Sequence, residues 1–224
     1  MHTLDRLIAR IKERHPEFEV RFKDEPLPKW LKPVFWFQGL ITKGFWTRYT
    51  TTVGAHVYFP SRQFYEESKE RTLVTLAHEF VHIHDGAELG KASFTLRYLF
   101  PQVTIGVFGL LGLLGLAWAP LYTLFVLFAA LGPWPAPWRV KYEKRGYKMS
   151  ILVSAMMGQS LDTARIASQF TGRQYYWMSH DKCGIMNWVK EEAMCARATL
   201  ACVKDLDRPY RDVHEIYYAF MKEK

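Results

Sequence analysis

The sequence predicts an α+β fold in a single domain that covers residues 1–224. Two observations predict this class. Segments in the first quarter of the chain alternate apolar and polar residues, which is typical of the strands of a small antiparallel sheet. Longer segments elsewhere repeat apolar residues every three or four positions, which is typical of helices packed on a core. No internal repeat and no linker marks a second domain.

The composition is that of a folded protein with basic character. Hydrophobic residues make up 49% and aromatic residues 16% of the chain, enough to bury one sizeable core. The net charge of +8 suits nucleic acid or an anionic membrane surface. Because the chain has no recognisable nucleic-acid-binding motif, nucleic acid is not a predicted partner. The cysteines Cys183, Cys195 and Cys202 form no C-x-x-C pair, so we expect reduced thiols in a reducing compartment.

The N-terminal elements follow from their apolar periods. Residues 2–15 carry a helical apolar stripe and predict an amphipathic helix that packs on the domain. Residues 18–23 alternate and predict a strand, and residues 24–33 hold three prolines and predict a loop. Residues 45–59 are rich in Thr, Tyr, Val and Phe, and predict a hairpin or a bent strand around Gly54.

Residues 64–85 predict one continuous helix that ends at Gly86, and this helix carries a His-Glu-x-x-His motif. Because residues four apart point to the same side of a helix, His78 and His82 can both bind one ion at roughly 2.0–2.1 Å. Glu79 is placed to take a proton from the attacking water of a zinc hydrolase. The alternative is a helix with two ordinary core histidines, which would leave Glu79 buried beside them without compensation.

An uncharged run of 29 residues spans 103–131. One membrane-spanning helix needs about 20 apolar residues, so this run is long for one span and short for two. Pro120 divides it into roughly equal halves, which predicts a hydrophobic helical hairpin within residues 101–137. Lys and Arg flank both ends, which favours membrane lipid as a partner at the cytoplasmic face. A hairpin packed in protein, within an oligomer or a larger soluble or viral assembly, is the alternative.

A zinc hydrolase site has three protein ligands and an open position. Three carboxylates compete for the third place. Glu143 follows the hairpin and begins a helical segment that continues through residues 149–170, and it is favoured. Glu88 lies six residues after His82. Asp85 lies on the same helix face as His78. It could bind the metal as the third ligand, or it could accept a hydrogen bond from the free N–H of a histidine that binds the metal. Two further helices are predicted at residues 187–206 and 212–222.

The His78-Glu79-x-x-His82 helix, the hydrophobic hairpin and Glu143 on a following helix resemble the gluzincin metallopeptidases. The resemblance covers about residues 55–160 and is strongest to the compact membrane-associated gluzincins. It implies a zincin-like domain that hydrolyses peptide bonds of a protein or peptide substrate. It also implies Zn²⁺ held by His78, His82 and Glu143, with Glu79 as the catalytic base. In such enzymes an extended substrate adds to a strand beside the cleft.

Peptide hydrolysis also needs a donor for the developing oxyanion. His180 and Tyr147 are the candidates, followed by Tyr175 and Tyr176. His84 is expected on the far side of the helix from His82. The rival function is a non-proteolytic structural or assembly protein that keeps the metal site and anchors its hairpin to membrane or partner subunits. A purely structural zinc site needs no base and usually has four protein ligands.

Overall fold

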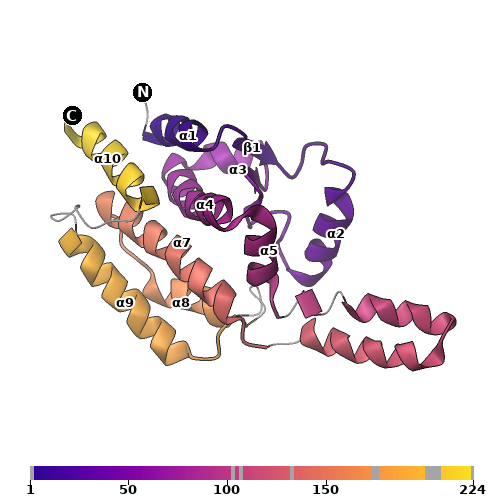
Figure 1. Cartoon of the computed structure of the whole chain (residues 1–224). Coiled ribbons are helices and arrows are strands. Elements are labelled where there is room, and N and C mark those ends of the chain that lie inside the picture. The colour runs from indigo at the N-terminus through magenta and orange to yellow at the C-terminus, as the bar shows by residue number, and fades with distance from the viewer. Residues whose placement is uncertain are drawn as a thin grey trace. The chain divides into compact units, whose positions relative to one another are not determined.

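The computed structural model describes residues 3–101, 104–105, 108–131, 134–172, 177–199 and 208–222. The fold is mostly helical with one small sheet, compatible with the predicted α+β class (Figure 1). The elements are α1 (Thr3–Arg14), β1 (Glu19–Phe22), α2 (Leu31–Ile41), β2 (Thr51–Val53), β3 (His56–Phe59), α3 (Arg62–Glu67), α4 (Lys69–Leu89), α5 (Lys91–Leu99), η1 (Gly109–Leu116), η2 (Ala119–Leu131), α7 (Pro137–Met156), α8 (Thr163–Thr171), α9 (Lys182–Thr199) and α10 (Arg208–Lys222).

The chain divides into two compact units. The first unit comprises Met1–Asp85, Arg145–Leu161 and Glu191–Lys224, and the second comprises Gly86–Lys144 and Asp162–Lys190. Each of the helices α4, α7 and α9 contributes to both units. The prediction of one domain stays a prediction.

The sheet has the strand order β1-β3-β2. β2 and β3 are antiparallel and joined by a tight turn, where Gly54 adopts a φ of +64° that favours glycine. β1 pairs with β3 in parallel, so the sheet is mixed and the predicted antiparallel sheet is wrong in this respect. A short turn imposes antiparallel pairing, whereas the long connection through α2 leaves β1 free to pair in parallel.

The first unit packs α1 against α10 (Figure 1). The predicted amphipathic helix is confirmed, because α1 buries Leu4, Leu7 and Ile11. Beside this apolar contact, Asp212 of α10 accepts hydrogen bonds from Arg10 at 2.9 Å and from the guanidinium of α1's last residue at 3.3 Å.

Helix α4 differs from its prediction at both ends. Ser68 interrupts the expected single helix, because its Oγ accepts a hydrogen bond of 3.2 Å from the Arg71 N–H and starts α4 as a separate element. Gly86 does not end the helix, which continues to Leu89. Gly90, the residue after the last turn, has a left-handed φ of +82° and ends the helix.

In the second unit the apolar run forms a helical hairpin of η1 and η2, which contact each other (Figure 1). Two glycines of η1 let the two helices approach each other closely. A Cβ added at Gly112 would lie 2.8 Å from the Phe125 ring, and one added at Gly115 would lie 2.5 Å from the Tyr122 ring. Within the described residues, no helix combines the length and the apolarity needed to cross a bilayer.

The C-terminal helices have other boundaries than expected. Residues 149–170 do not form one helix: α7 ends at Met156, Gly158 adopts a φ of +68°, and Asp162 caps α8 by accepting a hydrogen bond of 2.9 Å from the Arg165 N–H. α9 covers Lys182–Thr199, and residues 200–206 of the helix predicted over 187–206 lie outside the described residues. The last predicted helix is confirmed as α10.

Candidate metal centre

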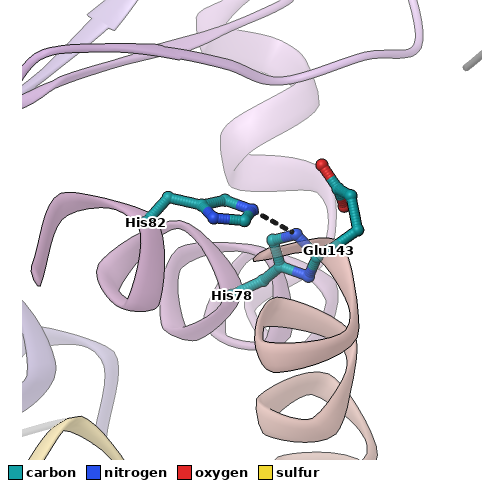
Figure 2. A group of neighbouring side chains, drawn as sticks. All are labelled: His78, His82 and Glu143. Atoms are coloured by element: carbon teal, nitrogen blue, oxygen red, sulfur yellow. Dashed lines mark hydrogen bonds between the residues drawn. The ribbon is translucent and has the colours of Figure 1, made fainter. Parts of the chain in front are cut away.

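The two histidines of the motif lie together on α4. The Nε2 atoms of His78 and His82 point toward each other and are 3.1 Å apart, and the two rings meet edge-on at an interplanar angle of 72° (Figure 2). Two ligands at tetrahedral positions around Zn²⁺, each about 2.05 Å from the metal, are separated by about 3.3 Å. The spacing of the nitrogens therefore matches that of two ligands on one ion.

Glu143 completes the cluster. One ligand atom from each of His78, His82 and Glu143 lies within 4.8 Å of the others, and all three residues are buried (Figure 2). Glu143 lies on α7. The two turns of α7 that follow Glu143 contact His78 through Tyr147 and Ser150. Two imidazoles and one carboxylate, each able to bind without its proton, are a donor set that fits Zn²⁺.

One face of α7 is built around His78. A Cβ at Gly146 would stand 2.6 Å from Nε2 of His78, so only glycine leaves room for the ring at this position. The ring of Tyr147 meets the same imidazole edge-on, with centroids 4.8 Å apart. These residues share one helix face with Glu143, because Gly146, Tyr147 and Ser150 follow it by three, four and seven positions.

Ser150 orients the His78 ring. Its Oγ lies 3.1 Å from Nδ1 of His78 and 3.4 Å from the carbonyl oxygen of Gly146. If His78 binds a metal through Nε2, its Nδ1–H donates to the Ser150 hydroxyl, which in turn donates to the carbonyl. Metal-binding histidines normally donate their other N–H in this way. Sequence reasoning missed Ser150 and Gly146, since only their spacing from Glu143 along a helix pointed to them.

The carboxylate of Glu143 is held from α5. The Tyr98 hydroxyl donates to its Oε1, and Nε of Arg139 donates to the Tyr98 carbonyl at 3.0 Å. Tyr98 also stacks on Phe94. Sequence reasoning missed Tyr98, because no local pattern links it to a carboxylate 45 residues later.

The other carboxylates that competed for the metal lie outside the cluster. Arg145 of α7 donates to both oxygens of Asp85, at 3.2 and 3.1 Å from Nε. Burial raises the pKa of the Asp85 carboxyl, and the positive charge of Arg145 opposes this rise. Glu88 is exposed on the last turn of α4. The predicted role of Asp85 as an acceptor for a ligand imidazole stays a prediction.

Glu79 points toward the sheet. The Thr52 hydroxyl donates to Oε2 of Glu79 at 2.7 Å, and Glu79 itself is half-buried. Thr52 lies in β2, which is an edge strand, whereas β3 is the central strand. The strand beside the predicted base is thus β2, although β3 comes just before the helical region in sequence.

The remaining candidates are His180, Tyr175 and Tyr176, together with His84, which is expected to face away from the motif. His180 is exposed in the second unit. Tyr175 and Tyr176 lie outside the described residues. The His84 ring contacts His15, at a centroid distance of 6.2 Å, in agreement with its expected orientation away from the motif. The roles of Tyr147 and His180 in oxyanion stabilisation stay predictions.

No protein-family model, no curated protein and no solved structure matches this chain. The chemistry of the cluster is therefore the basis for assigning a function.

Proposed function

We propose that the protein is a zinc-dependent endopeptidase with a zincin-like, gluzincin-type site. In this proposal His78, His82 and Glu143 hold Zn²⁺, and Glu79 is the catalytic base. The observation that carries the proposal is the placement of a half-buried carboxylate, Glu79, between the two clustered histidines in sequence and against the edge strand β2 in space. A structural metal site has no need of such a group.

When bound, the metal supplies positive charge that acidifies the attacking water and polarises the scissile carbonyl. Glu79 takes the proton released from the water and passes it to the leaving amine. The hydrogen bond from Thr52 fixes one carboxylate oxygen, which leaves the other to accept the proton. The Tyr147 hydroxyl is the proposed donor to the negative charge that develops on the carbonyl oxygen, because its ring already packs against His78.

The proposed substrate is a peptide in extended conformation. Among the strands of the described residues, β2 pairs with β3 alone, and its other edge offers main-chain groups for an added strand. A substrate bound there is held beside Thr52 and therefore beside the carboxylate of Glu79.

The decisive variant is Glu79→Gln in the full chain. We expect it to retain about one equivalent of zinc by metal analysis. We also expect it to lose about 10²- to 10⁴-fold in the hydrolysis of an unstructured peptide library, because the general base is gone. Glu88→Gln, on the exposed last turn of the same helix, is the matched control and should cleave at the wild-type rate. Equal hydrolysis by the Glu79→Gln and wild-type proteins would rule out the mechanism.

We also propose that the η1–η2 hairpin associates with membrane lipid. Its described residues include apolar side chains that are exposed, namely Leu111, Leu114, Trp118 and Val126. Their exposure supports contact with an apolar environment, and the alternative occupant is a partner subunit.

A further inference from the structure

Helix α2 presents an apolar face that the proposed peptidase activity does not use. Its inner side is anchored by Leu31 and Phe35, each 1% exposed, which pack with Phe45 and Tyr58. Its outer side, together with the N-cap residue Trp30, carries large hydrophobic side chains that are exposed: Trp30 at 63%, Val34 at 54%, Trp36 at 63%, Phe37 at 47% and Leu40 at 65%.

These side chains form one continuous arc. At 100° per residue, positions 30, 34, 36, 37 and 40 cover about 160° of the helix circumference, opposite the two buried residues. Trp46 extends the arc, since it is 40% exposed and its ring lies across Gly39, where an added Cβ would stand 2.3 Å from the indole nitrogen. Soluble surfaces scatter single hydrophobic residues, whereas a contiguous set marks an interaction site.

The charged residues of the segment that carries this arc have one sign. Between Glu25 and Glu66 the sequence contains no Asp or Glu. The cations in that interval include Lys29, Lys32, Lys43 and Arg48, which are exposed at the ends and edge of α2 and in the loop after it. The segment from Lys29 to Arg48 therefore combines an aromatic, apolar helix face with charges that are all positive.

This combination selects an anionic lipid surface over the other occupants. A second copy of the chain would bring the same cations face to face across a two-fold interface, which is repulsive. A bilayer with anionic headgroups offers negative charge for the lysines and an interfacial region that suits Trp. We propose that α2 lies in the membrane interface with its Trp30–Leu40 face in the lipid, independently of the η1–η2 hairpin.

The test is sedimentation of the full-length protein with vesicles of phosphatidylcholine, with and without phosphatidylglycerol. Replacing Trp36, Phe37 and Leu40 by Gln should weaken partition into the anionic vesicles by about 10-fold or more. Since these side chains are exposed, the far-UV circular dichroism and the urea midpoint should not change. If the triple variant does not fold, Trp36→Gln alone replaces it, with a smaller expected loss.

A charge variant separates the two parts of the proposal. Changing Lys29, Lys32 and Lys43 to Gln should remove most of the preference for anionic vesicles, at about five-fold per cation. The control removes three exposed lysines elsewhere, Lys69, Lys182 and Lys190, and should keep that preference.

Wild-type partition by the α2 apolar variant would overturn the proposal, and so would an equal loss of anionic preference in the control. Self-association that the α2 variant abolishes, without vesicle binding by the wild type, would instead identify a second copy as the occupant. The Glu79→Gln variant should bind vesicles as the wild type does, so this result is separate from the peptidase proposal.

Discussion

Gly146 lies where α7 passes over the ring of His78. A glycine inside a helix costs about 1 kcal/mol relative to alanine, so its presence in the middle of α7 needs a reason. The reason is steric, because the space that a Cβ would occupy is taken by the Nε2 edge of the His78 imidazole. The glycine lowers the local helix propensity but lets α7 approach the His78 ring closely.

We expect Gly146→Ala to lower zinc affinity by at least about 10-fold, because the new methyl group displaces His78. Alanine favours the helix by about 1 kcal/mol but crowds the His78 ring, so urea unfolding of the zinc-free variant is measured alongside to separate lost affinity from lost stability. Competition with a chromophoric chelator measures the affinity. Gly86→Ala is the matched control, since its Cβ would meet Phe94 at an ordinary 3.7 Å. Unchanged zinc affinity in Gly146→Ala would show that the ring is not confined in this way.

Lys23 is a buried base at the end of β1. Its Nζ donates to the carbonyl oxygens of Phe45 and Tyr49 at 2.9 and 2.7 Å. Burial lowers its pKa from 10.5 to about 7, and the negative charge of Glu79 opposes part of this change. A neutral amine has two N–H donors and satisfies both carbonyls. Lys23 thereby ties down the loop that leads into β2.

This pKa makes stability depend on pH. Below pH 7 both states carry the proton, and the folded state bears the full penalty of a buried ammonium. Between about 7 and 10.5 the unfolded chain binds a proton that the folded chain lacks. The free energy of unfolding should therefore rise with pH in this window, by about 1.4 kcal/mol per pH unit.

We expect Lys23→Met to remove this rise, as measured by urea unfolding across the same window. Lys69→Met, which removes an exposed lysine on α4, should retain it. An identical pH dependence in the Lys23→Met and wild-type proteins would mean that the Lys23 amine titrates normally.

At the scale of elements, α4 and α7 form the centre of the site. α4 contributes the histidines, and α7 contributes Glu143 together with the groups that contact His78. The ion pair of Asp85 and Arg145, with Nη2 and Oδ1 3.0 Å apart, sets the register of the two helices. The Tyr210 hydroxyl adds a hydrogen bond of 2.7 Å to the Arg145 carbonyl from α10.

Arg145→Ala should destabilise the metal-free protein by about 2–4 kcal/mol, because it leaves the buried Asp85 carboxylate uncompensated. The double variant with Asp85→Ala should recover part of that loss. Urea unfolding of the two single variants and the double variant gives the coupling free energy. Arg165→Ala, an exposed arginine on α8, controls for the loss of an arginine. Additive effects of the two changes would show that the pair does not couple the helices.

At the scale of the whole molecule, the hairpin and the metal cluster are built from different kinds of residue. The hairpin holds no charged group among residues 103–131, while the protein as a whole carries +8. Membrane association through the hairpin should therefore depend on apolar contact rather than on lipid charge.

We expect replacement of Leu111, Leu114 and Val126 by Gln to reduce flotation of the full chain with neutral phosphatidylcholine vesicles, because it removes exposed apolar surface. The matched control replaces Lys69, Lys182 and Lys190 by Gln, and should float as the wild type does. A wild-type protein that stays in solution as a monomer beside such vesicles would contradict lipid association.

Local patterns were enough to predict several elements and part of the site. The apolar stripe of α1, the turn at Gly54 and the pairing of His78 with His82 all depend on residues a few positions apart. The predicted ends of α4 were wrong even though they depend on local residues, because the helix begins after Ser68 and ends before Gly90. Caps compete with continued helix by fractions of a kcal/mol to about 2 kcal/mol, which periodicity does not resolve.

The sequence by itself determined that His78 and His82 face the same side of one helix and that Glu79 lies on the turn between them, because helix geometry fixes the direction of neighbouring side chains. It also favoured Glu143 among three acids. Only the tertiary structure decided that Ser150, 72 residues after His78, meets its ring, that Tyr98 holds Glu143, and that β1 joins β3 in parallel. These contacts join residues far apart in the chain, so they depend on how the elements pack rather than on any local spacing.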